Sequence, residues 1–157
     1  MMAVIAVDDL PGHVDREVAV SGWFPVTQAI IDEFAEATRD AQWIHVDTER
    51  AARESPFVDS NGRRCTVAHG FLTLSLLPVL IEDCIRITGA QAGINFGFDR
   101  IRFISPVPSG SQIRARFRLA KFERVANGVQ LAWSVTLERT GETRPAVTAE
   151  WLTRLLV

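Results

Sequence analysis

Apolar and polar residues alternate along the last third of the chain. Apolar side chains recur at every second position in three segments, which are residues 113–119, 129–137 and 147–151. Because successive side chains of a strand point to opposite faces, each segment predicts a β-strand with one buried and one solvated face. Asn127-Gly128 stands between two of the segments and predicts a tight hairpin. The pattern indicates an antiparallel meander, with arginines on its wet face paired to acids such as Glu138.

Two more segments fit strands less regularly. The apolar positions of residues 96–98 are followed by those of residues 101–103 with shifted parity. A phase change of one residue predicts a β-bulge near Asp99-Arg100. Residues 14–20 also alternate, and they predict an edge strand or arm.

Helical periodicity is found in the first half of the chain. Thr27 is a candidate N-cap, and the apolar side chains that follow it fall on one face, so a helix should run to about residue 40. A second helix is predicted over residues 48–54, stopped ahead of Pro56. An irregular polar loop should follow at residues 58–64.

Residues 70–87 are apolar on almost every side, and a helix of that kind must be surrounded by protein. Pro78 lacks a backbone donor and should bend this helix, and Thr88-Gly89 should end it. One twisted antiparallel sheet can curl around such a helix. The sequence therefore predicts an α+β protein whose antiparallel sheet wraps a central buried helix, the hot-dog fold. We expect a single domain over residues 1–157.

Composition narrows the classes of function. The 157 residues are 47% hydrophobic and 23% charged, as in one globular domain. The net charge of −2 lacks the basic excess of nucleic-acid binders. The longest apolar stretch, residues 71–81, is too short to span a bilayer, and the N-terminus lacks the basic start of a signal peptide. Cys65 and Cys84 have no metal-ligand spacing, which favours reduced thiols in a cytoplasmic protein.

A carboxylate, an amide and an imidazole lie close together where the first helix should end, at Asp40, Gln42 and His45. The backbone must turn there, so Asp40 and His45 can converge on one point. They could hold a water molecule there and move its protons. A structural interpretation stays open, in which Asp40 caps turn amides and His45 packs as an ordinary polar residue.

The segment Ala68-His69-Gly70-Phe71 opens the central helix. Free N–H groups at a helix start favour developing negative charge, and a glycine lets a ligand approach the main chain. Gly70 could stabilise a developing oxyanion, or it could only relieve crowding. His69 is expected to cap or pack and not to catalyse. Ser75 could hydrogen-bond a catalytic side chain or bond back to its own helix.

These motifs resemble those of the MaoC-like dehydratases, the hot-dog group that includes the (R)-specific enoyl-CoA hydratases, and above all the NodN-like branch. The hydratase motif of that group reads Gly-Asp-x-Asn-Pro-Ile-His, then a hydrophobic residue and Asp. Residues 39–47 are similar to it, with Arg39 in place of Gly and Gln42-Trp43 in place of Asn-Pro. Residues 68–71 resemble a second signature, Ala-His-Gly-Phe. The similarity covers nearly the whole chain from about Trp23.

The resemblance implies a hydro-lyase that adds water to a trans-2-enoyl-CoA to give the (3R)-hydroxyacyl-CoA, with Asp40 and His45 as the catalytic pair. It assigns Gly70 to the oxyanion, and Ser75 and Gln42 to the substrate site. It implies no metal and no cofactor, since coenzyme A is part of the substrate.

The partners expected from the resemblance are the acyl-CoA thioester and a second copy of the chain. A homodimer is expected because the exposed edges of such sheets usually pair. No nucleic acid or membrane partner is expected. The loop at residues 58–65 is longer than in compact members, and its Arg63 and Arg64 either meet the coenzyme A phosphates or are simply solvated.

Two other functions fit the same fold. An acyl-CoA thioesterase would need a carboxylate on the central helix aimed at the thioester, but Glu82 and Asp83 lie far along it from Gly70. A non-catalytic acyl-CoA-binding subunit would not need both Asp40 and His45.

Overall fold

The alternating segments fold into one antiparallel sheet in a computed structural model of the protein, which describes residues 2–157. Met1, the first residue of the expected domain, lies outside the described residues. The elements in chain order are β1 (Ala3–Ala6), the 3-10 helix η1 (Val7–His13), β2 (Arg16–Val20), β3 (Phe24–Val26), α1 (Gln28–Thr38), α2 (Trp43–Val46), α3 (Thr48–Glu54), α4 (Gly70–Ser75), α5 (Leu77–Cys84), β4 (Ile85–Thr88), β5 (Ala92–Phe103), β6 (Ser111–Val125), β7 (Gly128–Arg139) and β8 (Val147–Leu156).

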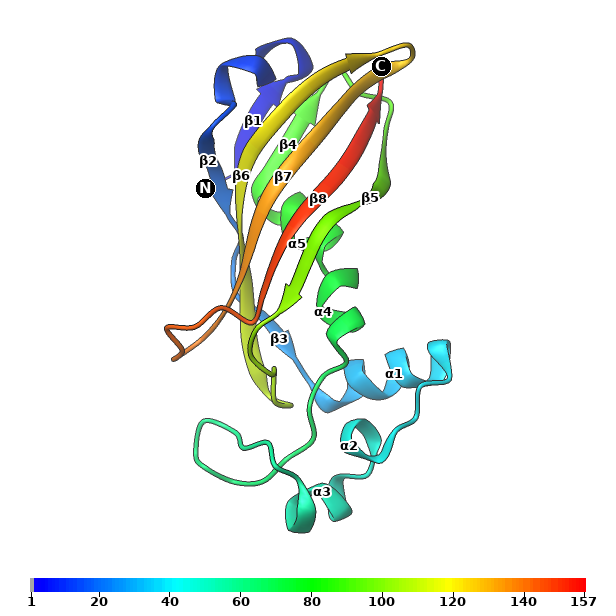
Figure 1. The fold of residues 1–157 in the computed structure, drawn as a ribbon, viewed down its shortest axis with the longest axis vertical. Coiled ribbons are helices and arrows are strands. Elements are labelled where there is room, and N and C mark those ends of the chain that lie inside the picture. Colours follow the sequence, from blue (N-terminus) through cyan, green and yellow to red (C-terminus); the bar gives the residue numbers. More distant parts are fainter. Residues whose placement is uncertain (1) are drawn as a thin grey trace.

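The strand order of the main sheet is β2-β6-β7-β8-β5, and β3 adds to β6. Figure 1 shows these strands as a long curved sheet with α4 and α5 beside it. The hairpin predicted at Asn127-Gly128 joins β6 to β7, where Val125 pairs with Gly128. The predicted bulge is also confirmed, because the register of β5 against β8 shifts between Phe98 and Arg100.

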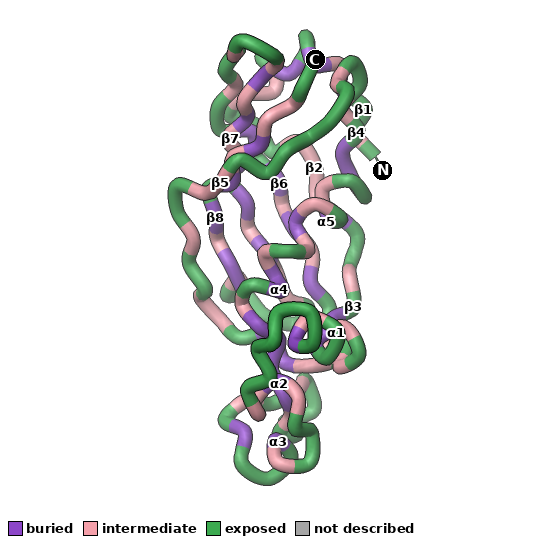
Figure 2. The backbone as a smooth tube through the Cα atoms, turned by 90° about the vertical axis from the view of Figure 1, so that its right-hand side faces the viewer, coloured by how far each residue is buried: buried purple, intermediate pink, exposed green. Residues whose placement is uncertain are grey.

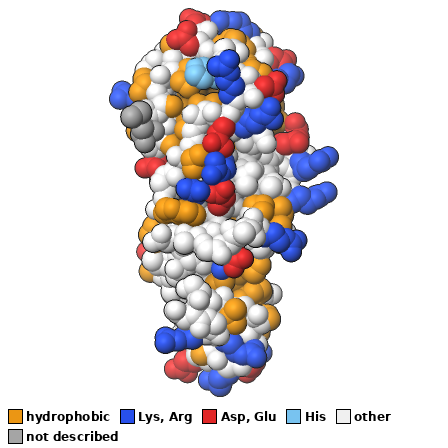
Figure 3. All heavy atoms as spheres, turned by 90° about the vertical axis from the view of Figure 1, so that its left-hand side faces the viewer, with side chains coloured by type: hydrophobic (Ala, Val, Ile, Leu, Met, Phe, Trp, Pro, Cys, Tyr) orange, Lys and Arg blue, Asp and Glu red, His pale blue; other side chains and the backbone are white. Residues whose placement is uncertain are grey.

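The core is formed by the side chains at every second position of the strands. Figure 2 shows buried and more exposed residues alternating along β6, β7 and β8. The opposite face carries the predicted ion pairs, since Glu138 accepts from Arg114 at 2.7 Å and from Arg116 at 2.6 Å. Arg116 also reaches Glu17 at 3.1 Å, on β2. Figure 3 shows acidic and basic side chains side by side on the side of the molecule that carries β2.

The single helix predicted over residues 70–87 is wrong in its length and continuity. The structure has two short helices that meet at Leu76, and the second ends at Cys84. Pro78 lies in the first turn of α5, where a missing N–H is tolerated, so it begins a helix and does not bend one. The last predicted turn is a strand, because Ile85 and Ile87 are β-branched and β4 pairs in parallel with β1.

The expectation that this helical segment is covered on all sides is also wrong. Leu72, Leu77 and Leu80 pack into the core, at 2–4% exposure. Phe71 is 69% exposed and Val79 is 45% exposed, however, so one side of the helices faces outward. The sheet covers α4 and α5 from one side only, which leaves an apolar strip open.

The helices α1, α2 and α3 gather at the end of the sheet near β3 (Figure 1). Thr27 caps α1 by accepting from the Ile30 N–H at 3.3 Å, and α1 ends at Thr38, where the prediction put its end near residue 40. The left-handed conformation of Arg39, with φ of 62°, turns the chain there. The helix predicted at residues 48–54 is confirmed as α3. No pattern in the sequence predicts the short helix α2.

The described residues contain no helix that is long and apolar enough to cross a membrane. Both cysteines are free thiols, as expected from their number and spacing, and Cys84 is buried on α5.

Candidate active site

The short helix α2 turns His45 into the protein, where its side chain is buried. Its Nδ1 lies 2.6 Å from the main-chain oxygen of Val67. A carbonyl oxygen can only accept, so Nδ1–H donates this bond and the lone pair of the neutral ring is on Nε2. The imidazole therefore presents an acceptor nitrogen at its free side.

Burial lowers the pKa of His45, because a charged imidazolium loses its hydration inside the protein. The bond to the Val67 carbonyl opposes this shift of the pKa, nearby His69 adds to it, and Asp40 opposes it. Burial outweighs the raising contributions, so the ring is held neutral near pH 7 and is ready to accept a proton.

Asp40 lies in the exposed turn between α1 and α2. The structure brings it to His45, since one side-chain ligand atom of each of Asp40, His45 and His69 lies within 4.8 Å of the others. Within residues 2–157 no hydrogen bond holds the Asp40 carboxylate, so the capping role has no support. The carboxylate and the buried imidazole are therefore near enough to share one water molecule.

His69 is the unexpected member of this group. It precedes α4 at the N-cap position, but its side chain makes no capping bond. Its ring stacks on that of His45, with centroids 3.7 Å apart and planes at 23°. Its Nε2 lies 2.9 Å from the main-chain oxygen of Asp40. The sequence offered only the choice between capping and packing, and the structure shows packing on His45.

Gly70 follows His69 and begins α4. A Cβ at Gly70 would lie 2.8 Å from the ring of Phe103, so even a methyl group would crowd this position. Gly70 and Phe103 line a hollow of about 440 Å³ together with Phe71. The close approach of Phe103 accounts for a glycine here by packing, as in the alternative that Gly70 relieves crowding at the start of α4, and its role towards a substrate stays a prediction.

The other two expected substrate residues lie at the edges of this arrangement. Ser75 donates from Oγ to the Phe71 carbonyl at 2.8 Å, so it bonds back to its own helix. No hydrogen bond joins it to Asp40 or His45 among the described residues. Gln42 is exposed, and it is its carbonyl that accepts from the His45 N–H at 2.9 Å. The structure brings the side chains of Asp40 and His45 within 4.8 Å of each other, and among the described residues no side-chain hydrogen bond joins Ser75 or Gln42 to them.

Gln28 supports the site from α1 and was not expected from the sequence. Its amide nitrogen donates to the His45 main-chain oxygen at 2.7 Å and to Asp32 at 2.8 Å. Its amide oxygen accepts from the buried Thr66 hydroxyl. A lone glutamine at a helix start carries no signal of such a role, because its partners are distant in the sequence.

The cluster of Asp40, His45 and His69 fits a metal ion poorly. Stacked rings direct their in-plane lone pairs along nearly parallel planes, whereas ligands must converge on one point. One nitrogen of each ring also already contacts a main-chain oxygen. The arrangement suits proton transfer better than coordination.

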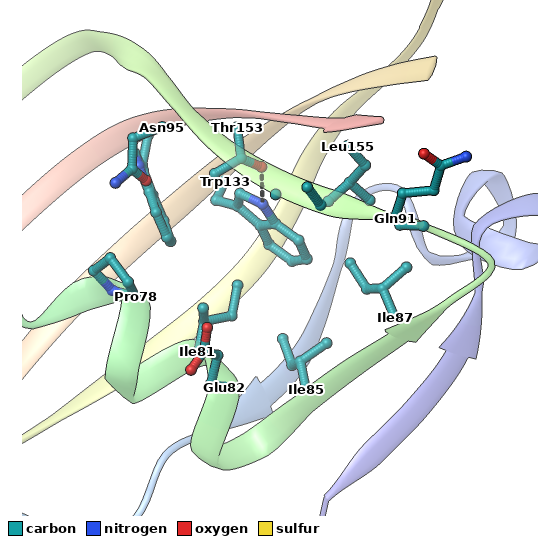
Figure 4. A pocket seen from close by; sticks show the side chains of 14 residues that line it. Pro78, Ile81, Glu82, Ile85, Ile87, Gln91, Asn95, Trp133, Thr153 and Leu155 are labelled. Carbon is teal, nitrogen blue, oxygen red and sulfur yellow. Dashed lines mark hydrogen bonds between the residues drawn. The ribbon is translucent and has the colours of Figure 1, made fainter. Parts of the chain in front are cut away.

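Two further hollows follow the helices away from Gly70. The second, of about 420 Å³, shares Phe71 with the first and is also lined by Ser75. The third, of about 280 Å³, shares Pro78, Asn95 and Trp151 with the second. Figure 4 shows the third hollow between Pro78, Ile81 and Trp133, whose indole N–H donates to Thr153 at 3.1 Å. We call these three adjoining hollows the trough.

The family model described as "MaoC like domain" matches residues 9–139. The chain belongs to the MaoC-like family. The MaoC-like protein is 44% identical to Nodulation protein N of Rhizobium leguminosarum bv. viciae over 154 residues, which are 97% of this chain and 92% of that relative.

Other relatives of the MaoC-like protein include proteins with an enzyme's name. It is 43% identical to 3-hydroxyacyl-thioester dehydratase Z of Mycobacterium tuberculosis (strain ATCC 25618 / H37Rv), over 95% of each chain. The solved (R)-hydratase from A. caviae superposes with a TM-score of 0.62 at 21% identity, over 87% of this chain and 96% of that one. The family resemblance and the hot-dog fold expected from the sequence are therefore confirmed.

Proposed function

We propose that this MaoC-like protein is an (R)-specific enoyl-CoA hydratase or dehydratase. It would add water to a trans-2-enoyl-CoA to give the (3R)-hydroxyacyl-CoA, or catalyse the reverse reaction. The observation that carries the proposal is the approach of the Asp40 carboxylate and a His45 ring nitrogen within 4.8 Å. The similarity to a 3-hydroxyacyl-thioester dehydratase supports the same chemistry.

The proposed mechanism moves one proton. A water molecule between Asp40 and His45 gives a proton to the pair while its oxygen bonds to the β-carbon of the enoyl group. The Gly70 N–H stabilises the negative charge that develops on the thioester oxygen. The pair then returns the proton to the α-carbon, so both side chains end as they began. The reaction is polar and transfers no electrons, so it requires no redox cofactor, and acid–base catalysis by the pair needs no metal in this proposal.

The rest of the substrate would follow the surface on both sides of this centre. The acyl chain would lie in the trough, which begins at Gly70. The coenzyme A phosphates would meet Arg63 and Arg64, which are exposed on the loop before α4.

We also propose a homodimer, because Phe71 and Phe103 are 69% and 52% exposed and pack edge to face at 6.0 Å. Two free thiols favour a cytoplasmic location.

The test is the loss of enoyl absorbance when pure protein is added to crotonyl-CoA. We expect hydration by the wild type and a loss of about 100-fold or more in kcat for both Asp40→Asn and His45→Gln, because general acid–base catalysis contributes that much. Asp9→Asn and His13→Gln make matched changes on η1, away from the site, and should keep the rate.

The same reactions, followed for release of free thiol, separate the proposal from its alternatives. Thiol release without hydration would indicate a thioesterase. Asp83 is an unsuitable base for that reaction, because it accepts from the Gly22 N–H at 2.7 Å. Binding of acyl-CoA with neither reaction, on short and long enoyl chains alike, would indicate a non-catalytic binding subunit.

A further inference from the structure

We propose that His69 is a positioning residue that fixes where Asp40 and His45 lie relative to each other and to the Gly70 N–H. Its catalytic meaning rests on the function proposed above. His69 is bonded or packed to all three of these residues and, in the proposed reaction, takes no proton and touches no substrate. Removing it should therefore change the geometry and titration of the pair and leave substrate binding largely intact.

The contacts of His69 span the site. Its ring stacks on His45 at 3.7 Å, its Nε2 meets the Asp40 main-chain oxygen at 2.9 Å, and its peptide bond leads directly to Gly70. As the Asp40 oxygen can only accept, Nε2–H must donate. One side chain thus links the turn after α1, the helix α2 and the start of α4.

The turn that carries Asp40 has little else to hold it. Arg39 and Asp40 are exposed, and within residues 2–157 the one bond of the Asp40 N–H is a long one of 3.4 Å to the Thr38 hydroxyl. The bond from His69 is shorter and comes from a ring that is only 3% exposed. Catalysis requires precise placement of the reacting groups, so the effect of this bond on the rate should exceed its modest contribution to stability.

An imidazole is a poor choice for packing alone. Phe34 lies against the His69 ring, with centroids 5.0 Å apart, so the surroundings would suit a phenyl ring. The His69 Nδ1 is buried and has no hydrogen-bond partner within the described residues. Leaving a polar atom buried and unpaired is unfavourable. What the imidazole adds over a phenyl ring is the Nε2–H that reaches Asp40.

His69 also acts on the titration of His45. The titratable groups that act on His45 are His69 and Asp40, and His69 lowers the pKa of His45 while Asp40 raises it. The remaining contacts of His45 described above, the Val67 carbonyl and the Gln28 amide, are neutral, and Asp32 is joined to them only through Gln28. Without His69 the pKa of His45 should rise, and the acidic limb of the rate profile should move to higher pH.

Two substitutions separate the stacking of His69 on His45 from its hydrogen bond to Asp40. His69→Phe keeps a ring to stack on His45 and removes the donor to Asp40, whereas His69→Gln keeps a donor amide and removes the ring. We expect His69→Phe to lower kcat at least about tenfold with KM within about twofold, and His69→Gln to recover most of kcat. Phe34→Leu disturbs the packing around His69 without touching Asp40 or His45, and it should leave kcat within about twofold.

Imidazole NMR gives a measurement that needs no substrate. The chain has three histidines, so His13→Gln and His45→Gln assign all the ring nitrogen signals. In the wild type we expect His45 as the Nδ1–H tautomer. In both His69 variants the His45 titration should move to higher pH, with spectra that remain those of a folded protein. If His69→Phe does not fold, His69→Gln still tests this shift.

The outcomes are separable. A fall in kcat for His69→Phe, its recovery in His69→Gln and a raised His45 titration support positioning by His69. An unchanged titration overturns the proposal, as does an equal loss of kcat in both His69 variants and Phe34→Leu, which would mean a structural role alone. If the wild type hydrates no enoyl-CoA, the proposed function fails, whereas the NMR titration still decides whether His69 sets the state of His45.

Discussion

A main-chain carbonyl, and not a carboxylate, orients His45. The bond from Nδ1 to Val67 leaves Nε2 as the acceptor, and the Gln28 amide holds the main chain of the same residue at 2.7 Å. Neither partner carries a charge that would compensate an imidazolium, so burial controls the titration. At the residue scale, the site favours a neutral base whose protonation is disfavoured in the folded state.

This depressed pKa predicts how stability depends on pH. An unfolded histidine titrates near 6.5, and in the folded protein the pKa of His45 is lower. Between the two values the unfolded chain binds more protons, so stability rises with pH there. The contribution of His45 is fully present above the unfolded pKa and is lost as the pH falls through 6.5 towards the folded value.

Urea unfolding at pH 5.5 and 7.5 measures this effect. We expect the wild type to lose more unfolding free energy on acidification than His45→Gln, with a limiting slope of about 1.4 kcal/mol per pH unit for one proton. His13→Gln, on η1, serves as the control substitution. Equal pH dependence in the wild type and His45→Gln would contradict the burial argument.

At the scale of elements, the sequence predicted strands better than the central helix. Alternation is local, so β6, β7 and β8 could be recognised from their own residues. The end of the helical segment depends instead on β1, which pairs with Ile85–Thr88 from about 80 positions earlier in the chain. Apolar residues fit both a buried helix and a buried strand, so pattern alone could not place that boundary.

The residues of the site differ in how far apart they lie in the sequence, and this decided which of them could be predicted. Asp40 and His45 are five positions apart, so a turn between them was enough to suggest that they meet. His69 lies 24 positions after His45, and Gln28 lies 17 positions before it. Their contacts depend on how α1 and α4 pack, which no local pattern reveals. The roles of Gly70, Ser75 and Gln42 in binding substrate stay predictions.

The β6–β7 hairpin requires a glycine at position 128. Gly128 has φ of 148°, and a Cβ there would lie 1.9 Å from the main-chain oxygen of Leu155. Main chain inside a sheet cannot move aside easily, so Gly128→Ala should lower the unfolding free energy by about 3 kcal/mol or more. Gly141 has φ of 80° with nothing within 4 Å, so Gly141→Ala should cost only about 1–2 kcal/mol of backbone strain.

Urea unfolding of the two alanine variants tests this difference. A larger midpoint shift for Gly128→Ala, with similar slopes, would show that contact with β8 adds to the strain of the backbone conformation. Equal midpoints would mean that the hairpin relaxes away from Leu155, and the close approach would not be essential.

At the scale of the whole molecule, the one-sided cover of α4 and α5 joins the site to the trough. The sheet packs on the core side of these helices and leaves their other side open. From Gly70 to Ile81 the helices extend roughly 16 Å, and the three hollows of the trough follow them. A four-carbon acyl chain would occupy only the part nearest Gly70, so the far part matters only for longer chains.

Asn95 is exposed on β5 and lines both the second and third hollows. Asn95→Phe should narrow the trough between them. We expect the ratio of kcat/KM for dodecenoyl-CoA to that for crotonyl-CoA to fall about tenfold, because only the longer chain must pass this point. Ile94→Phe enlarges the neighbouring side chain, which lines none of the three hollows, so it should keep the wild-type ratio. An equal fall in kcat/KM for both substrates in Asn95→Phe would mean that the trough does not hold the acyl chain. The exposed apolar strip would then be explained by contact with a second copy alone.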